Sequence, residues 1–406
     1  MQSEQLIVLA VMIFVLIIFT LGKSPLFRVD RTGSVLIAVS VLLCTKINDF
    51  LELVSFVDFQ TITILFCMMV IVANLRLAGM FELVGNLLNT HINSERKLLL
   101  AVIIMSGFLS AIAINDIVCL LFTPIVIMVC NNFGVAAKPH LIGLAIASNI
   151  GSAGSLIGNP QNILVASLSG ISFSFYISET LPIVLLGLVL SYFWIAFQYR
   201  ASLKKVVVFN KASNCFYHKY LLVKSSFVLL GIVVGYMLGH NLLILTLLGA
   251  SLLLLTRRVN PNKIYRGIDF NLLIMFVGLF AIIGSIEKSG LLELLLKNLS
   301  STLQDSFIFF IGLTVVLSNI VSNVPAVLLL KNFIPGSDTE IWWTSLALVS
   351  TVAGNLTLFG SMANLIVVEI AKGKNIKITA GEYFKIGCPL TIVLTIVAYF
   401  KMLYKL

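Results

Sequence analysis

A carboxylate beside an amide interrupts a long apolar stretch in the first third of the chain. Asp116 follows Asn115 between two mostly apolar arms of about 15 residues each, and it is the one carboxylate that we place deep in the membrane. An ionised Asp at mid-bilayer costs at least about 2.5–3.5 kcal/mol, so we expect Asp116 to bind a cation or to carry a proton. The alternative is a structural Asp that caps the second arm.

Two polar segments rich in small residues interrupt other apolar stretches. The first reads SNIGSAGSLIGNPQN over residues 148–162, and the second reads STVAGNLTLFGSMAN over residues 350–364. Glycine costs about 1 kcal/mol and proline about 3 relative to alanine inside a helix, so we expect unwound breaks here. Lipid cannot satisfy the freed backbone groups, and such breaks therefore line polar cavities that can hold ions. Close helix packing is the alternative for Gly151, Gly154, Ser155 and Gly158 taken singly.

The composition requires that these segments lie in a membrane. Of 406 residues, 59% are hydrophobic and 11% are charged, against roughly 45–50% and 25% in soluble domains. A helical span needs about 20 apolar residues. We expect about 10 transmembrane helices in an all-α polytopic protein: eight plain spans near 6–22, 33–50, 59–78, 180–199, 221–239, 241–256, 269–286 and 383–402, with two broken spans at 140–168 and 342–371. The chain contains no ATP-binding P-loop, so an ion gradient must supply the energy of transport.

An internal duplication organises these elements. Asp58 and Phe59 match Asp269 and Phe270, and the segment 148–162 matches 350–364. Before each break lies a polar tip between apolar arms, which predicts re-entrant hairpins at 98–133, entering from the cytoplasm, and 303–333, entering from outside. We expect a first repeat over residues 1–200, a cytoplasmic linker over 201–219 and a second, inverted repeat over 220–406.

The basic residues indicate an orientation. The net charge is +10, and Arg31 belongs to the large set of basic residues predicted on one face, which the positive-inside rule makes cytoplasmic. Both termini are then outside the cytoplasm, and the charge contacts lipid headgroups rather than nucleic acid. No Arg or Lys is predicted at mid-membrane, which favours a small monovalent or weakly charged solute. The basic residues predicted on the outer face are Lys46, Lys288, Lys297, Lys331, Lys401 and Lys405.

The paired hairpin tips and breaks resemble those of the ion transporter superfamily, in particular its citrate-transporter-like branch with arsenite efflux pumps, sodium/proton antiporters and divalent-anion symporters. The resemblance implies elevator-type alternating access and a homodimer. It also implies substrate and ion contacts at Asn115, Asp116, Gly158, Asn159, Pro160, Asn162, Ser322, Asn323, Pro325, Gly354, Asn355, Thr357, Gly360, Ser361 and Asn364. From the first break we add Ser148, Asn149, Gly154 and Ser155 as candidates. A sodium ion is expected at Asn115, Asp116, Asn159 and Asn323.

These observations predict a secondary transporter of a small anion or weakly charged solute in the plasma (inner) membrane, and not an enzyme. Sodium or a proton is the expected coupling ion, and no other cofactor is expected. Arsenite or antimonite efflux and sodium/proton antiport are the alternatives within transport. An ion channel is the alternative outside it, although a channel pore is typically lined by a ring of one residue type across subunits.

Overall fold

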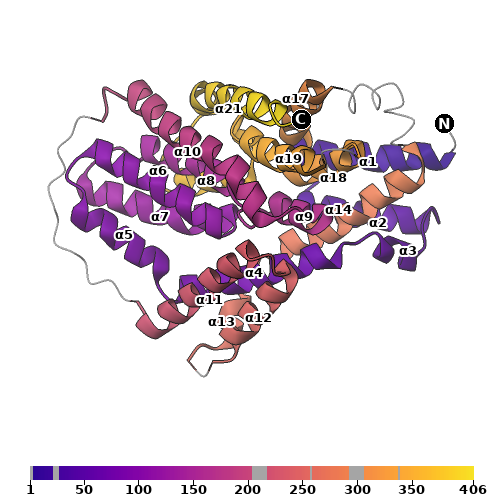
Figure 1. The fold of residues 1–406 in the computed structure, drawn as a ribbon, viewed down its shortest axis with the longest axis horizontal. Helices are drawn as coiled ribbons and strands as arrows, with labels where there is room; N and C mark the ends of the chain where they lie inside the picture. The colour runs from indigo at the N-terminus through magenta and orange to yellow at the C-terminus, as the bar shows by residue number, and fades with distance from the viewer. Residues whose placement is uncertain (1–2, 22–26, 204–216, 257, 292–305, 337–338) are drawn as a thin grey trace.

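The computed structural model describes residues 3–21, 27–203, 217–256, 258–291, 306–336 and 339–406. Within these ranges the regular elements are helices (Figure 1). Six of them are long and apolar enough to cross a membrane, and shorter apolar helices accompany them. The expected fold class, an all-α polytopic membrane protein, is confirmed. Residues 204–216 of the expected linker, 303–305 of the second hairpin, and Lys297 lie outside the described residues.

The first half of the chain contains ten helices in the described residues. They are α1 (Ser3–Leu21), α2 (Arg31–Cys44), α3 (Phe50–Ser55), α4 (Phe59–Leu77), α5 (Met80–His91), α6 (Glu95–Ile112), α7 (Asn115–Phe133), α8 (Ala137–Ala153), α9 (Pro160–Ser169) and α10 (Phe173–Gln198). Helices α6 and α7 form the first hairpin, and α8 and α9 are the two halves of the first broken helix.

The second half repeats this order of elements. Its described helices are α11 (Lys219–Met237), α12 (Leu242–Leu254), α13 (Pro261–Tyr265), α14 (Phe270–Lys288), α17 (Phe307–Val321), α18 (Asn323–Leu330), α19 (Thr339–Ala353), α20 (Met362–Gly373) and α21 (Ala380–Leu403). Helices α17 and α18 form the second hairpin, and α19 and α20 form the second broken helix. The breaks at 154–159 and 354–361 fall inside the predicted polar segments.

Matching residues of the two halves begin and end α4 and α14 in the same way. Asp58 accepts a hydrogen bond from the backbone N–H of Gln60, and Asp269 accepts one from Leu272, so each Asp caps a helix of 19 residues. Gly79 and Gly290 follow these helices with φ angles of 85° and 66°, a left-handed conformation that glycine adopts without steric cost. The residues that match in the sequence therefore occupy equivalent positions at the ends of these two helices.

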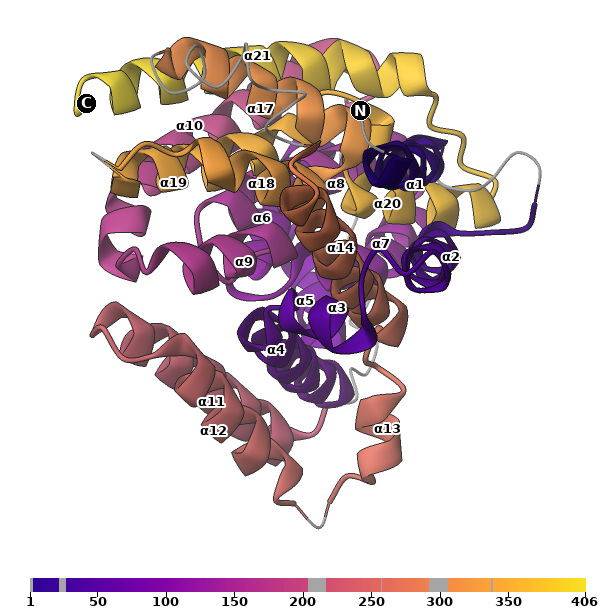
Figure 2. The same ribbon diagram turned by 90° about the vertical axis from the view of Figure 1, so that its right-hand side faces the viewer.

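The two broken helices pack against each other along both of their halves. Helix α19 packs against α8 and α9, and α20 packs against α7 and α8. The first half of one broken helix thus lies beside the second half of the other, as Figure 2 shows near the centre of the molecule.

The first hairpin has longer arms than its apolar residues suggested. Helix α6 has 18 residues and α7 has 19, against arms of about 15. At 1.5 Å per residue the two arms reach about 27 and 28 Å, close to the thickness of a bilayer core. The physical reason for the longer α6 is its capped first turn: Ser94 accepts from the N–H of Lys97, and the helix begins among charged residues.

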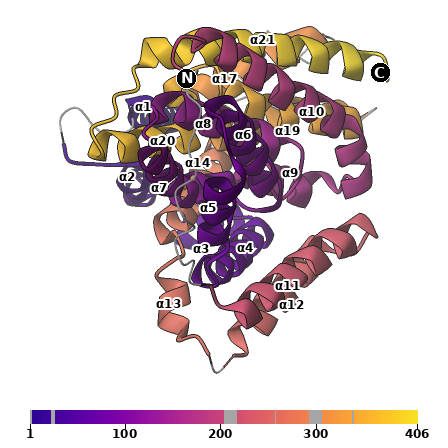
Figure 3. The ribbon, with the colours of Figure 1, turned by 90° about the vertical axis from the view of Figure 1, so that its left-hand side faces the viewer.

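Helices α11 and α12 lie apart from the hairpins. They pack on each other and on α4, and Figures 2 and 3 show the pair beneath the rest of the bundle from opposite sides. Large apolar side chains on this pair are exposed, including Phe227 at 76% and Leu248 at 58%. Such surfaces suit contact with lipid or with another apolar surface.

The salt bridges join charges that the sequence predicts on the same face. Lys288 lies 2.5 Å from Glu52, and Lys331 lies 3.2 Å from Glu287, beside the N-terminal helix. Glu52 lies outside the spanning helices, and its hydrogen bond with Lys288 lowers the pKa of its carboxyl group. Three further salt bridges are Lys401 and Lys405 with Glu179, and Lys138 with Glu382.

Candidate functional site

A small cavity lies where both hairpin tips meet both broken helices. Its volume is about 40 Å³. Its polar lining includes Asn115 and Asp116 from the first tip, Asn323 from the second tip, and Gln161 and Ser361 from the broken helices. The complete lining is Phe19, Arg31, Asn115, Asp116, Pro160, Gln161, Leu272, Met275, Phe276, Ser322, Asn323, Val324, Pro325, Ser361 and Met362.

Besides α2, whose first residue is Arg31, four helices begin at this cavity. Helices α7, α9, α18 and α20 start at Asn115, Pro160, Asn323 and Met362, and each of these residues lines the cavity. The unpaired N–H groups of a helix N-terminus carry about half a positive charge. The four starts therefore favour a negative charge, or an oxygen atom, on whatever binds there.

Two amide oxygens at this site lack a hydrogen-bond partner within the part of the chain that the structure describes. They are Oδ1 of Asn115 and Oδ1 of Asn323, one from each hairpin tip, and both side chains are at least nine-tenths buried. Buried polar atoms are normally paired, so each unpaired oxygen marks a place for a donor or a cation.

Asp116 lies in the first turn of α7 and lines the cavity. Among the described residues it forms no hydrogen bond or salt bridge, but it interacts electrostatically with Arg31 and Asp269. The alternative of a structural cap is wrong, because Ile114 is the N-cap of α7 and no side chain caps that helix. Asp116 is thus a carboxylate in a cavity without a structural partner, which leaves it available to an ion.

Asn149 lies at the centre of a buried network behind the cavity. Its Oδ1 accepts hydrogen bonds from Asn115 Nδ2 at 3.1 Å and from the hydroxyl of Ser361 at 3.0 Å. Its Nδ2 donates to Asn355 at 2.8 Å and to Asn364 at 3.0 Å. One amide of the first repeat therefore orients the first hairpin tip and three polar side chains of the second repeat.

Asn162 and Asn364 hold the two breaks in equivalent ways. Asn162 Nδ2 donates to the carbonyls of Ser152 and Ser155, ten and seven residues before it. Asn364 Nδ2 donates to the carbonyls of Gly354 and Thr357, at the same separations. Both side chains are fully buried and lie outside the cavity lining, so the structure gives them backbone partners rather than a position beside a ligand.

Of the residues predicted for the site, the cavity lining brings together Asn115, Asp116, Pro160, Ser322, Asn323, Pro325 and Ser361. The other predicted residues lie behind it. Ser148 bonds to Ser110, Thr357 donates to Asn319, and Asn355 accepts from Tyr383. Those outside the lining are Ser148, Asn149, Gly154, Ser155, Gly158, Asn159, Asn162, Gly354, Asn355, Thr357, Gly360 and Asn364.

Asn159, one of the four predicted sodium ligands, caps a helix instead. Its Oδ1 accepts from the N–H of Asn162 at 2.8 Å, and its Nδ2 donates to Ser152 and Thr351. The bond from Asn162 uses the side-chain oxygen that a sodium ion would need. Asn115, Asp116 and Asn323, the other predicted sodium ligands, remain together at the cavity.

The glycines of the first break allow the backbone to approach closely. A Cβ on Gly158 would lie 2.5 Å from the carbonyl oxygen of Ser152 and 2.8 Å from that of Ser110, and a Cβ on Gly151 would overlap the backbone of Gly107. Gly151 and Gly158 therefore bring α8 and the break against α6. Close helix packing, the alternative given for the single small residues, therefore applies to Gly151 and Gly158. This packing places the first hairpin tip against the break.

Arg31 is a residue of the site that the sequence reasoning missed. We expected it on the cytoplasmic face and no Arg at mid-membrane, but it is 9% exposed and lines the cavity near Asp116. Its position follows from Asp30, which caps α2 by accepting from the N–H of Gly33 and so starts that helix at the cavity. The sequence carries no signal that separates Arg31 from loop arginines.

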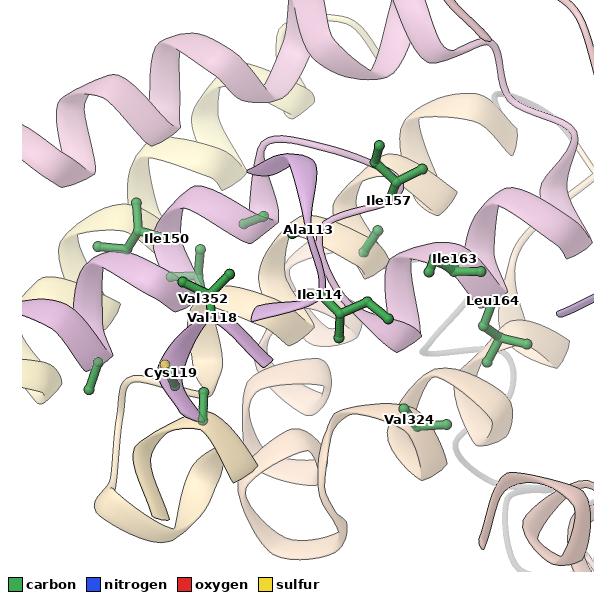
Figure 4. Close-up of a cluster of buried hydrophobic side chains, with 14 of the residues drawn as sticks. Ala113, Ile114, Val118, Cys119, Ile150, Ile157, Ile163, Leu164, Val324 and Val352 are labelled. Carbon is green, nitrogen blue, oxygen red and sulfur yellow. The ribbon is translucent and has the colours of Figure 1, made fainter. Parts of the chain in front are cut away.

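Apolar side chains of both repeats surround the breaks. Figure 4 shows Ile114 at the first tip, Ile163 in α9 and Val324 in α18 among a cluster of buried hydrophobic residues. Leu272, Met275, Phe276 and Met362 complete the apolar lining and were also missed, since nothing in an apolar helix distinguishes cavity residues from core residues. A wider depression of about 700 Å³ lies beside Lys219, Arg258 and Lys263, but no residue matched between the repeats lines it.

Comparison with known proteins agrees with this architecture. The chain is 28% identical over 416 residues to a 46 kDa membrane protein of Mycobacterium leprae, covering 95% of this chain and 96% of that protein. It is 27% identical over 447 residues to the silicon efflux transporter LSI3 of Oryza sativa subsp. japonica, covering 91% and 92%. A putative transporter arsB of Dictyostelium discoideum is 25% identical over 487 residues, covering 91% and 86%.

The fold resembles that of a solved transporter structure. The YdaH transporter of Alcanivorax borkumensis superimposes with a TM-score of 0.60 at 12% identity, and the match covers 99% of this chain and 97% of that one. The family described as citrate transporter matches residues 14–353 of this chain. The chain is therefore a membrane transporter and not an enzyme, and it belongs to the citrate transporter family of the ion transporter superfamily.

Proposed function

We propose that this chain is a secondary transporter that moves a small anion or weakly charged, oxygen-rich solute, driven by an ion gradient. The observation that supports the proposal is the cavity between both hairpin tips and both broken helices. The second arm of each hairpin and the second half of each broken helix begin there. A site built from two inverted repeats lies between two similar halves, so access can alternate between the two sides of the membrane.

The size of the cavity supports a small solute. Drug-sized ligands occupy sites of roughly 300–1,000 Å³, whereas this cavity has about 40 Å³. A solute of a few heavy atoms with oxygen at its surface suits four helix N-termini and two amide oxygens. The rice relative is named for silicon efflux, so silicic acid is the first solute to test, and arsenite is the second.

Elevator-type movement is part of the proposal. The hairpins and broken helices pack on one another through α6–α8, α7–α20 and α17–α19, while α11 and α12 pack on α4. This division supports a mobile body that carries the site and a second body that stays in place. The exposed apolar face of α11 and α12 is the surface through which we propose that two copies form a homodimer.

Asp116 is the proposed coupling residue, for sodium or for a proton. It has no structural partner among the described residues, and the unpaired oxygens of Asn115 and Asn323 lie at the same cavity. Oxygen atoms of a carboxylate and two amides can coordinate a hard cation, and a carboxylate alone can carry a proton. We further propose the inner membrane as the location, with both termini outside the cytoplasm.

Counterflow in proteoliposomes tests the proposal. Vesicles that contain the purified protein and unlabelled silicic acid, arsenite or nitrate are diluted into a trace of the same labelled solute. We expect transient accumulation of the label for at least one solute, with empty vesicles as the control. Flux that never exceeds equilibration would favour the channel alternative, and the absence of any protein-dependent flux would contradict the proposal.

A further inference from the structure

Arg31 is a buried cation without a carboxylate partner. It begins α2, it is 9% exposed, and among the described residues no salt bridge includes it. Its guanidinium group is protonated at every physiological pH. Burying a charge without a partner is costly, so such a residue persists where a ligand completes its surroundings.

Within the described residues, only the two terminal nitrogens of the guanidinium group have hydrogen-bond partners. Its Nη2 donates to the carbonyl oxygen of Phe19 at 2.9 Å, and its Nη1 contacts the thioether sulfur of Met362, which is a weak acceptor. The ring of Phe19 lies 5.7 Å from the centre of the group. The remaining nitrogen, Nε, is buried and has no hydrogen-bond partner in the part of the chain that the structure describes.

The unpaired N–H of Arg31 complements the other unpaired groups at the cavity. Asn115 and Asn323 offer acceptor oxygens, and Arg31 offers a charged donor. Arg31 is also the one positively charged side chain in the cavity lining. Asp116 is the carboxylate in the same lining.

We propose that Arg31 binds an oxygen atom of the transported solute through its guanidinium group. This inference rests on the proposed function, because it concerns the same cavity. The positive charge of the guanidinium group favours a ligand oxygen atom that carries a full or partial negative charge. The substrate class is therefore a small oxyanion or a hydroxylated acid.

Binding measurements on purified protein test this assignment. The variants are Arg31→Gln, which removes the charge, Arg31→Lys, which keeps the charge but loses the planar fork, and Arg28→Gln, an exposed control three residues away. The probe is nitrate, a small oxyanion. A hydrogen bond to a charged group is worth about 1.5–3 kcal/mol, so we expect Arg31→Gln to bind nitrate about 10- to 150-fold more weakly.

The other results separate binding from structure. We expect Arg31→Lys to bind nitrate with an intermediate affinity and Arg28→Gln to match the wild type. Wild-type nitrate affinity in Arg31→Gln, or in Arg31→Lys if the Gln variant does not fold, overturns the role of Arg31. If the wild type shows normal counterflow together with either result, the proposed function stands and only the role of Arg31 is wrong. If the wild type shows no counterflow, the proposed function itself is wrong.

Discussion

The side chain of Asn149 donates a hydrogen bond from Nδ2 to Oδ1 of Asn364, 3.0 Å away and 215 residues later in the chain. Thr351, which occupies the position of Asn149 in the second repeat, donates in turn to Oδ1 of Asn162 at 3.1 Å. Asn149 of the first half therefore holds the amide of Asn364, and Thr351 of the second half holds the amide of Asn162. Each of these two amides bonds to the backbone of the break in its own half. The two breaks form one connected structure, and the cavity lies against it.

A double-mutant cycle tests the bond between Asn149 and Asn364. Removing one buried hydrogen-bond partner leaves the other unsatisfied and costs about 1–3 kcal/mol. We expect Asn149→Ala and Asn364→Ala each to lower the free energy of unfolding by such an amount. The double variant should deviate from the sum by about 0.5–3 kcal/mol, because the two residues contact each other. Chemical denaturation in detergent provides the measurement.

The cap residue Asn241 supplies the control for this cycle. It accepts hydrogen bonds from the backbone at the start of α12, away from both breaks, and its replacement by Ala should cost about 1 kcal/mol. Combined with Asn364→Ala, its effect should add within about 0.5 kcal/mol. Strict additivity in the Asn149 and Asn364 pair as well would show that the bond between the repeats contributes nothing.

Gly151 is expected to tolerate no side chain. A Cβ at this position would overlap the backbone of Gly107 in α6, and backbone cannot move aside as a flexible side chain can. We expect Gly151→Ala to destabilise the protein by at least about 1–3 kcal/mol. Gly231→Ala in α11 is the matched control, since nothing lies within 4 Å of that position, and it should be neutral or stabilising. Thermal unfolding that ranks the two variants equally would contradict the close approach.

Ser322 at the second hairpin tip has a strained backbone. Its φ angle is 75°, which a residue other than glycine rarely adopts. Ser322→Gly and Ser322→Ala both remove the hydroxyl group, but only glycine relieves the strain. We expect the Gly variant to be more stable than the Ala variant by about 1 kcal/mol or more in thermal unfolding. An Ala variant as stable as the Gly variant would show that the tip relaxes without cost.

The sequence alone was sufficient for the features that depend on local chemistry. The sequence pairs Asp58 with Asp269, and in the structure both residues cap equivalent helices. Both breaks appear where small and polar residues interrupt apolar helices. Asn115 and Asn323 reach the same cavity, as the pairing of the tips predicts.

The features that depend on tertiary packing could not be predicted from the sequence. The residues next to Arg31 in the sequence resemble those next to a loop arginine. Only the fold brings Arg31 to the cavity that Asp116 also lines. The partners of Asn162 and Asn364 are backbone carbonyls, whose positions depend on the path of each break. An amide can bind a ligand or close a turn, and its residue type does not distinguish the two roles.

The orientation in the membrane is open to a labelling experiment. In a background without native cysteines, Lys374→Cys should react only with a reagent applied to the cytoplasmic side. Lys46→Cys and Asn332→Cys should react only from outside, and all three positions are exposed on the protein surface. The expected pattern follows from the distribution of basic residues. Reaction of Lys374→Cys and Lys46→Cys from one side would overturn the inverted topology.

The most direct test of the account compares gradient-driven transport by the wild type and by Asp116→Asn in proteoliposomes. We expect the wild type to accumulate solute when a sodium or proton gradient is imposed, and we expect Asp116→Asn to lose this accumulation, because its amide cannot carry a proton and holds a cation poorly. Glu369→Gln, which removes an exposed carboxylate on α20, should transport like the wild type. Unchanged accumulation by Asp116→Asn, with the same dependence on pH and sodium, would contradict the assignment of the coupling ion to this cavity.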